Sequence, residues 1–321
     1  MRQLVLGVDA GGTSSRAALF TVDGALVGRG HAAGANPVTL GMDRATANLT
    51  AAIREAAHSS SLSHVSAVVV GLAGNPGSCR SLAERVLRPL LPQSPPVRVA
   101  GDIVTAFAAG TSAPSGTVLI SGTGAIAAKI TNHEQTATAD GYGWLLGDEG
   151  SGFWLGHAAA RATVRALATP DPRAAPSVDR GGGSLVALVV RHLLPEGVGE
   201  DPVAQLAAAV HARPPLALAE LAPLVSRAAE AGDQVAESLV TEAASRLAST
   251  AAQVHEPGLP IVLAGSVLTS DGPVKRAVQG LLAGAATAGD AAGAAAWLAA
   301  RPLLGHDRAA RTHHRFVATA G

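Results

Sequence analysis

The segment "LVLGVDAGGTSSRAALF" (4–20) constrains the fold of this chain more than any other. An apolar run ends in Asp9, and two glycines and three hydroxyl residues follow before a second apolar run begins. Glycines let a backbone turn its N–H groups toward a bound anion at close range, and hydroxyls add further donors. The pattern favours a phosphate-binding turn between two strands, with contacts from Gly11, Gly12 and Thr13. Asp9 would hold Mg²⁺, directly or through water, although a tight turn with a capping aspartate is the alternative.

A second glycine–hydroxyl turn follows another apolar strand near the middle of the chain. The segment "SGTVLISGTGAIAAKI" (115–130) places Gly122, Thr123 and Gly124 between two strand-like runs, which repeats the first pattern. Neither turn is a Walker A loop, because no G-x-x-x-x-G-K-[ST] occurs. A Rossmann dinucleotide site is the alternative, since the glycine spacing matches its looser fingerprint and Asp140 follows at a suitable distance. Rossmann glycines open a helix, however, whereas "AIAAKIT" alternates as a strand, and Asp140 is expected to precede a loop and not to end a strand.

The order of the expected elements predicts an α/β fold with two mixed sheets and helices packed on them. The first part of the chain is expected to form strands at 3–10, 15–21 and 25–33, a helix at 41–58, a strand at 64–74, a helix at 78–91 and a strand at 97–102. The pattern restarts near residue 115, as it would in a duplicated domain. Later elements are expected to be helices at 151–166, 184–194, 201–212, 216–231, 233–254 and 290–301, a loop at 168–183, a strand at 259–268 and a solvated tail from 311.

We therefore predict two domains, 1–113 and 114–321, with the helix at 290–301 packing back on the first. Two phosphate-binding turns, one in each domain, are best explained by a single nucleotide in a cleft between them. A third turn, Gly265-Ser266, follows the last expected strand and would lie near the adenosine.

The composition excludes several classes of function. Lys plus Arg equals Asp plus Glu at 24 each, so no overall positive charge attracts nucleic acid or an anionic membrane. Cys79 is the only cysteine, and one thiol cannot hold an iron–sulfur cluster or a cysteine-based zinc site alone. No signal peptide is recognised, and no apolar stretch reaches the ~20 residues needed to span a bilayer. We expect a cytoplasmic protein with neither a nucleic-acid nor a membrane partner.

Five segments together carry a resemblance to a known family. They are, in chain order, "VDAGGTSSR" (8–16), "GANPVTLG" (34–41), "VAGDIVTAFAAG" (99–110), "ISGTGAIA" (120–127) and "GYGWLLGDEGSGFWLG" (141–156). In this order they resemble the first phosphate loop, sugar-binding segment, catalytic-aspartate segment, second phosphate loop and long Gly/Asp/Glu motif of the N-acetylglucosamine kinases. These form a BadF/BadG/BcrA/BcrD ATPase-like branch of the actin, sugar-kinase and heat-shock ATPase superfamily. The similarity spans nearly the whole chain, and the segment 141–156 is its most specific part.

The resemblance implies two ribonuclease-H-like domains of the actin-like ATPase type, flanking a cleft for ATP, Mg²⁺ and a sugar. It implies that Asp102 binds the sugar and accepts the proton of its 6-hydroxyl as that oxygen attacks the γ-phosphate. The other sugar contacts it implies are Asn36, Gly141, Tyr142 and Asp148. On the adenosine side it implies Ala219, Gly265 and Ser266.

Simpler interpretations of these residues stay open. Asp102 is also placed to cap a helix, Asn36 to form an Asn-Pro turn, and Asp148 with Glu149 to cap the helix expected at 151–166. Tyr142 stands where the sugar kinases often have tryptophan, so ring stacking on the sugar is not implied here.

The predicted function is phosphorylation of an amino sugar, N-acetylglucosamine or glucosamine, by a kinase that is expected to be a homodimer. An ATP-driven electron-transfer activator with the same fold is the alternative. Such activators hold a cluster between two subunits with two cysteines from each, whereas a dimer of this chain offers only Cys79 and its copy. A sugar-sensing regulator would need a DNA-binding module, and the chain begins directly with the strand before the first turn.

Overall fold

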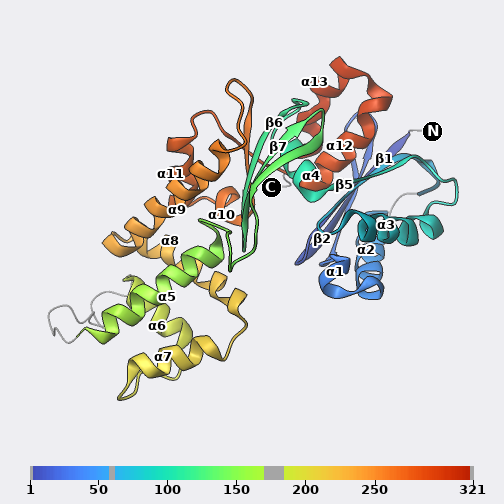
Figure 1. Cartoon of the computed structure of the whole chain (residues 1–321). Coiled ribbons are helices and arrows are strands. Elements are labelled where there is room, and N and C mark those ends of the chain that lie inside the picture. The colour runs from blue at the N-terminus through green and yellow to red at the C-terminus, as the bar shows by residue number, and fades with distance from the viewer. Residues whose placement is uncertain (1–2, 58–61, 170–183, 319–321) are drawn as a thin grey trace.

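The computed structural model describes residues 3–57, 62–169 and 184–318. Within them, two five-stranded mixed sheets are each flanked by helices (Figure 1). The first sheet has the order β3-β2-β1-β4-β5 and the second has the order β10-β9-β6-β7-β8. The predicted α/β class with two mixed sheets is confirmed.

The two sheets have the same topology. The strands of the first are β1 (Leu4–Ala10), β2 (Ser14–Thr21), β3 (Leu26–Ala33), β4 (Val65–Leu72) and β5 (Val97–Gly101). Those of the second are β6 (Gly116–Ser121), β7 (Ala125–Thr131), β8 (Glu134–Asp140), β9 (Ile261–Ala264) and β10 (Ala286–Thr287). In each sheet three strands run antiparallel in succession, and the two later strands join in parallel on the other side of the first. The repeated strand–turn–strand pattern in the sequence thus corresponds to a repeated sheet.

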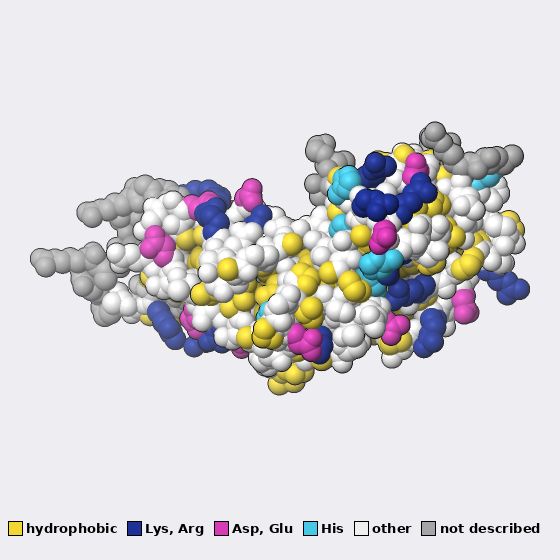
Figure 2. Space-filling view, turned by 90° about the horizontal axis from the view of Figure 1, so that it is seen from above, with side chains coloured by type: hydrophobic (Ala, Val, Ile, Leu, Met, Phe, Trp, Pro, Cys, Tyr) yellow, Lys and Arg dark blue, Asp and Glu magenta, His cyan; other side chains and the backbone are white. Residues whose placement is uncertain are grey.

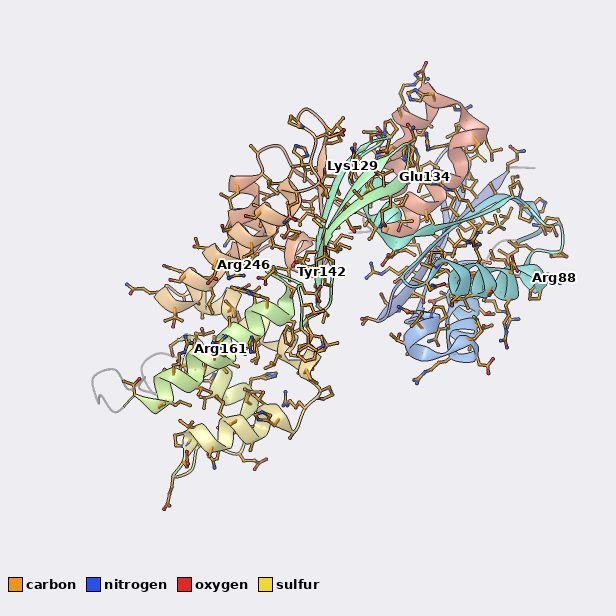
Figure 3. The ribbon with its side chains drawn as sticks, in the orientation of Figure 1. Arg88, Lys129, Glu134, Tyr142, Arg161 and Arg246 are labelled. Carbon is orange, nitrogen blue, oxygen red and sulfur yellow. The ribbon has the colours of Figure 1, made fainter. Side chains whose placement is uncertain are left out.

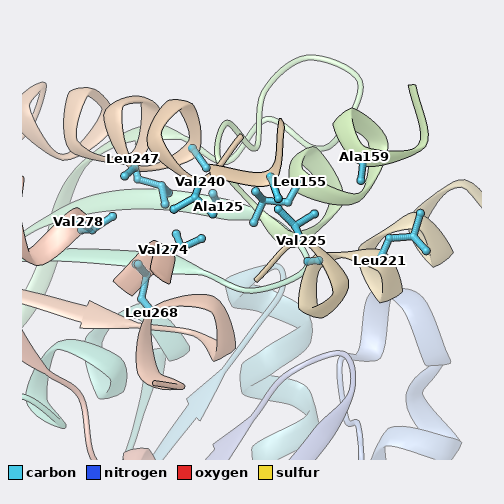
Figure 4. Close-up of a cluster of buried hydrophobic side chains, with 14 of the residues drawn as sticks. Ala125, Leu155, Ala159, Leu221, Val225, Val240, Leu247, Leu268, Val274 and Val278 are labelled. Atoms are coloured by element: carbon cyan, nitrogen blue, oxygen red, sulfur yellow. The ribbon is translucent and has the colours of Figure 1, made fainter. Parts of the chain in front are cut away.

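Helices cover the outer faces of both sheets. On the first sheet lie α2 (Met42–Ala56) and α3 (Pro76–Leu90), and α1 (Pro37–Leu40) packs against both helices. We call this sheet, with α1–α3 and α4 (Asp102–Ala108), the first half. The helices of the second half are α5 (Gly152–Ala168), α6 (Leu185–Leu193), α7 (Pro202–His211), α8 (Ala222–Glu230), α9 (Gln234–Ala252), α10 (Ser266–Thr269) and α11 (Pro273–Leu281). Short 3₁₀ turns occur at Leu62–His64 and Pro215–Leu221. Figure 4 shows part of the core between these helices and the second sheet, where Leu155, Val225 and Leu247 are buried.

Three further helices, α4 (Asp102–Ala108), α12 (Ala291–Leu304) and α13 (His306–Val317), form a core shared by the two sheets. Helix α12 packs directly on β1. A Cβ at Gly7 would lie 2.1 Å from the Ala292 carbonyl oxygen and 2.1 Å from the Ala296 nitrogen. Glycine on the strand and alanines on the helix allow this close approach. Because the backbones lie so near each other, small side chains fill the space between them and few aromatic residues are needed in the core. The division of the chain at residue 113 into two domains remains a prediction.

Three expectations about single elements are wrong. Residues 134–140 form the edge strand β8, so Asp140 does end a strand. The helix expected at 216–231 is divided, because a 3₁₀ turn precedes α8. The C-terminal residues 306–317 form α13 and are not a solvated tail, since Ala309, Thr312 and Phe316 are buried on one helix face. Residues 170–183 of the expected loop lie outside the described residues.

The outer face of α13 is basic. Arg308, Arg311, His314 and Arg315 are exposed there, and Figure 2 shows arginine and histidine side chains gathered at this end of the molecule. One face of α13 is therefore exposed and basic and the opposite face is buried, as in an amphipathic helix.

A buried histidine in the turn that joins β7 to β8 packs against α12. The His133 side chain is 2% exposed, and its ring stands edge-on to Trp297 with centroids 5.7 Å apart. Neither ring nitrogen has a hydrogen-bond partner among the described residues. Burial, followed by the charges of Arg301, Arg98 and His313, lowers the pKa of His133 to about 4. The folded protein therefore holds this imidazole neutral at physiological pH.

Burial of the neutral His133 ring should make the stability of the folded protein depend on pH. Unfolded His133 takes up a proton near pH 6.5, whereas folded His133 resists protonation down to about pH 4. The contribution of His133 to the free energy of unfolding should thus be complete above pH 6.5 and fall by about 3 kcal/mol as the pH drops to 4. Urea titrations of His133→Phe should show a weaker pH dependence over this interval, whereas the exposed His314→Gln should keep the wild-type dependence. Identical dependence in His133→Phe and wild type would contradict the prediction.

Candidate active site

The first glycine turn lies at the carboxyl end of β1, where it joins β2. It is held from one side only: the Gly11 carbonyl accepts a hydrogen bond from the Ala35 nitrogen at 3.0 Å, and Gly34 packs directly against Gly12. On the other side it is open, because a Cβ added at Gly11 or at Gly12 would meet nothing within 4 Å. A backbone that is supported from behind and open in front is suited to receive a phosphate.

Two carboxylates meet beside this turn. Asp9 at the end of β1 accepts a hydrogen bond from the Thr105 hydroxyl at 2.8 Å, and the same hydroxyl lies 2.8 Å from the carbonyl oxygen of Asp102. Asp102 is the first residue of α4, which begins where β5 ends. Thr105 therefore ties the end of β1 to the beginning of α4. Thr105 could not be singled out from the sequence, because its role depends on β1 and α4 lying side by side.

Both carboxylates have raised pKa values. Burial, partly offset by the Thr105 hydrogen bond and reinforced by the charge of Asp102, raises the pKa of Asp9 to about 6. Burial also raises the pKa of Asp102, although hydrogen bonding to the backbone nitrogen of Ile103 opposes the shift. A carboxylate with a raised pKa is a stronger proton acceptor, and it would be stabilised by a cation nearby.

Asn36 caps the amino end of the short helix α1, where the simpler interpretation expected an Asn-Pro turn. Its Oδ1 accepts a hydrogen bond from the Val38 nitrogen at 2.9 Å. The same oxygen lies close to Gly74, in the loop that follows β4. Helix capping uses only the oxygen of this amide, and the nitrogen has no hydrogen-bond partner among the residues that the structure describes.

The second glycine turn joins β6 to β7 and is held by the beginning of α5. The Gly152 nitrogen donates to the Gly122 carbonyl at 2.7 Å, and the Phe153 nitrogen donates to the Thr123 carbonyl at 3.1 Å. Beside the turn is a cavity of about 390 Å³. It is lined by the predicted nucleotide contacts Gly122, Thr123, Ala219 and Ser266, together with residues of α8 and α11. The structure thus brings together predicted contacts from distant parts of the second half.

Gly265 supports this cavity without lining it. Its φ is +81°, and a Cβ there would lie 2.4 Å from the Ser121 carbonyl oxygen. Both features require glycine at the point where β9 turns into α10. The predicted Gly265-Ser266 turn is therefore formed, with Ser266 facing the cavity.

Asp148 lies behind the second turn. Its side chain is 8% exposed, Oδ1 lies 3.3 Å from the Ala125 nitrogen, and a Cβ at Gly124 would clash with the carboxylate. Burial raises the pKa of Asp148. Its contact with a sugar stays a prediction, whereas its contact with the turn is part of the structure.

Asp140 organises the loop from Gly141 to Glu149, a role that sequence reasoning missed. Its Oδ1 accepts hydrogen bonds from the backbone nitrogens of Gly141 and Asp148, and its Oδ2 accepts one from that of Glu149, each at 2.8 Å. One carboxylate therefore fastens both ends of the loop. An aspartate at the end of a strand and before a glycine-rich loop was the available signal.

This loop presents side chains at its tip. Tyr142, Leu145 and Leu146 are between 68% and 82% exposed, and Figure 3 shows Tyr142 where the strands of the second sheet end. Gly141 is at φ +78° and packs on Ile126. The predicted sugar contacts Gly141 and Tyr142 thus belong to a loop whose ends are fixed and whose tip is exposed.

If the loop contacts a sugar, as the resemblance implies, replacing Asp140 by alanine should disturb sugar binding more than nucleotide binding. Loss of three backbone hydrogen bonds should lower the free energy of unfolding by about 1–3 kcal/mol and raise the KM for the sugar at least tenfold. The KM for ATP should change less than threefold. Asp201→Ala is the control, because Asp201 also accepts a backbone hydrogen bond, from Ala204 at 2.9 Å, but caps the remote helix α7. Equal changes in the two KM values would contradict the assignment.

Glu149 has a structural partner. It forms an ion pair with Arg246 of α9, which also pairs with Glu242 and lies 5.0 Å from the centre of the Trp154 ring. These contacts fasten the end of the loop to α9. Because the Glu149 carboxylate is already paired with Arg246, Asp9 is the better candidate for a metal ligand.

The residues present fit Mg²⁺ bound mainly by phosphate. No group of three or more His, Cys, Asp or Glu side chains that could hold a metal occurs within residues 3–57, 62–169 and 184–318. Mg²⁺ commonly uses one or two carboxylates, water and substrate phosphates. Asp9 supplies such a carboxylate beside an open turn, and its raised pKa reflects a buried negative charge that a cation would neutralise.

The fold and the two turns define a class of protein, the actin-like ATPases with two related α/β units. Residues 6–285 match the BadF/BadG/BcrA/BcrD ATPase family, and this chain belongs to that family. Within the described part of the chain, no helix is both long and apolar enough to cross a membrane.

Two related proteins are named as sugar kinases. An N-acetylmuramic acid/N-acetylglucosamine kinase from Clostridium acetobutylicum is 26% identical over 178 residues, which are 51% of this chain and only 54% of that protein. An N-acetyl-D-glucosamine kinase from Dictyostelium discoideum is 23% identical over 257 residues, 77% of each chain.

Two crystal structures share the fold. A protein assigned as an N-acetylglucosamine kinase from Chromobacterium violaceum superposes with a TM-score of 0.67 at 25% identity, over 92% of this chain and 99% of that one. Another, from Porphyromonas gingivalis, superposes with a TM-score of 0.62 at 20% identity, over 87% and 90%. Together with the family match, these similarities confirm the resemblance that the motifs of the chain carry.

Proposed function

We propose that this protein transfers the γ-phosphoryl group of ATP to the 6-hydroxyl of an amino sugar, with N-acetylglucosamine as the first candidate and glucosamine as the second. The observation that carries the proposal is the pair Asp9 and Asp102, joined through Thr105 beside an open phosphate-binding turn. The names of the related kinases support the same reaction.

In this proposal Asp102 is the general base. The sugar O6 attacks the γ-phosphorus, the bond from that phosphorus to the β–γ bridging oxygen breaks, and ADP leaves with the electron pair. The proton of O6 passes to the Asp102 carboxylate. Asn36 would hydrogen-bond the sugar through its amide nitrogen, since its oxygen caps α1.

The two glycine turns would hold the nucleotide. Gly11, Gly12 and Thr13 would contact the terminal phosphates from the first half, and Gly122, Thr123 and Gly124 would contact them from the second. Ala219 and Ser266 line the cavity in which the adenosine would lie. Mg²⁺ would be held by Asp9, directly or through water, and would neutralise charge on the phosphates.

An activator with an iron–sulfur cluster is a poorer fit. Cys79 is 2% exposed and packs in the core of the first half, where it cannot reach a cluster shared between subunits. The expected homodimer remains a prediction.

The proposal is tested by measuring ADP formation with purified protein, ATP and Mg²⁺ across a panel of amino sugars and plain hexoses. We expect turnover with N-acetylglucosamine or glucosamine that exceeds turnover with glucose, and a product whose phosphate lies on C6 by NMR. ADP formation that is independent of every sugar would contradict the proposal and favour an ATPase function.

A further inference from the structure

A cluster of basic side chains surrounds Trp297 of α12 at the junction of the two halves. The ring centres of His133 and His313 lie 5.7 Å and 4.7 Å from that of Trp297. The guanidinium carbon of Arg301, about one helical turn further along α12, lies 5.3 Å from the same ring. Arg98 of β5 joins the cluster, because its Nη2 donates a hydrogen bond of 2.6 Å to the His133 carbonyl oxygen. Side chains from β5, the β7–β8 turn, α12 and α13 are thus brought together.

The two arginines of this cluster have no counter-charge. Neither Arg98 nor Arg301 forms an ion pair with any residue that the structure describes. Arg98 is paired with Val69 of β4, which lies in the core shared by the two sheets, so its side chain points to the α12 side of the sheet. Burial, and then the charge of Arg98, lowers the pKa of Arg301. The two guanidinium groups therefore repel each other, and an anion beside both would remove this repulsion.

The His133 ring also lacks a partner. It is 2% exposed, and neither of its nitrogens has a hydrogen bond within the described part of the chain. Its backbone is at φ +58°, in a two-residue hairpin turn where glycine is favoured. The charges that act on it, those of Arg301, Arg98 and His313, are all positive, and no carboxylate is among them. A buried donor without an acceptor is costly, and an anion at the arginines would supply that acceptor.

We propose that Arg98, Arg301 and His133 bind a phosphate group at the junction of the two halves. A phosphate group carries close to two negative charges at neutral pH, which balances two guanidinium groups. Each guanidinium presents paired N–H donors to such an oxyanion, and the neutral imidazole adds one more. Both arginines are partly exposed, so the anion can reach them from solvent.

This site is separate from the proposed catalytic site. Arg98 precedes Asp102 by four residues of extended chain, about 13 Å along β5. The inference therefore does not depend on the proposed sugar-kinase function. Because Arg98 belongs to the first half and His133 to the second, a bound anion would hold the two halves against each other.

Sodium sulfate is a suitable probe, because sulfate is a tetrahedral dianion whose charge stays constant between pH 5 and pH 8. Calorimetric titration at constant ionic strength, balanced with sodium chloride, measures its affinity. We expect Arg98→Gln and Arg301→Gln each to weaken sulfate binding at least fivefold, and Arg301→Lys to recover part of the loss. Arg311→Gln is the matched control, since Arg311 is exposed on the basic outer face of α13, and it should bind sulfate as wild type does. Urea unfolding without sulfate establishes that each variant is folded.

The pH dependence of sulfate binding tests His133. The ring is neutral in the empty site, and a bound anion favours its protonated form. The affinity of the wild-type protein for sulfate should therefore rise at least threefold from pH 8 to pH 5. His133→Phe replaces the imidazole with another planar ring and should lose most of this rise.

Three outcomes would overturn the inference. One is wild-type protein that binds sulfate no better than chloride. Another is equal sulfate affinity in wild type and Arg301→Gln, which would place the anion elsewhere, for example at the glycine turns. The third is an equal loss in Arg311→Gln and Arg301→Gln, which would show unspecific attraction to a basic surface. Inorganic phosphate and a hexose 6-phosphate are the two sources of the group, and the part of each affinity that Arg301→Gln removes shows which of them the site accepts.

Discussion

Replacing Asp102 by asparagine is expected to lower kcat by a factor of about 10²–10⁴, with small changes in the affinities for ATP and sugar. The amide keeps the size and polarity of the side chain but cannot accept the proton of the attacking hydroxyl. The backbone hydrogen bond from Ile103 to Oδ1 can persist, so α4 should begin at the same residue. Steady-state kinetics and calorimetric titration of both ligands measure the two effects.

Asp43→Asn is the matched control for this variant. Asp43 is also an aspartate in the first turn of a helix, α2, but it is exposed and pairs with Arg85 away from the turns. It should keep wild-type kcat. Turnover by Asp102→Asn within a few-fold of wild type would remove Asp102 from the role of base.

The pH dependence of kcat/KM is a second test of Asp102 as the general base. A base must be deprotonated to act, so kcat/KM should fall as the pH drops through the pKa of Asp102, which burial raises above its ordinary value of 3.8. Asp9, with its pKa of about 6, would add to the acidic loss because its protonated form holds a cation poorly. Activity that is constant from pH 7 to pH 4 would contradict both assignments.

The second large effect is expected for Gly12→Ala. A Cβ at Gly12 meets nothing within 4 Å and the residue is not at positive φ, so the folded protein should be as stable as wild type. The same Cβ would occupy the space in which a phosphate approaches the backbone. We expect the affinity for ATP to fall at least tenfold, while that for AMP, which lacks the terminal phosphates, changes less than twofold.

Gly280→Ala provides the control. Gly280 lies in α11, where an added Cβ also meets nothing within 4 Å and alanine favours the helix. This variant should bind ATP and AMP as wild type does. If Gly12→Ala weakened ATP and AMP equally, or neither, the first turn would not contact the terminal phosphates.

The parts of the site that are formed by residues adjacent in the sequence could be predicted from the sequence alone. The glycine turns at Gly12 and Gly122 could be recognised because glycines, hydroxyls and an apolar strand follow one another directly. The repeat of that pattern also predicted the second mixed sheet, which the shared topology confirms.

Roles that depend on packing could not be predicted in this way. Thr105 matters because α4 lies beside β1, and Asp140 matters because the loop after it returns to its carboxylate. Strand β8 was missed because five of its seven residues are exposed and polar or small, so no apolar alternation marks it. For α13 the signal was present, since Ala309, Thr312 and Phe316 follow a helical period, but the charged residues between them obscured it.

We expect turns from both halves to hold the terminal phosphates of one nucleotide. Hydrogen–deuterium exchange of residues 11–13 and 122–124 tests it directly, with Mg²⁺ and a non-hydrolysable ATP analogue, with AMP, and without nucleotide. We predict that the ATP analogue slows exchange in both segments over the same concentration range, and that AMP leaves residues 11–13 unprotected. Protection of only one segment by the ATP analogue would contradict the claim.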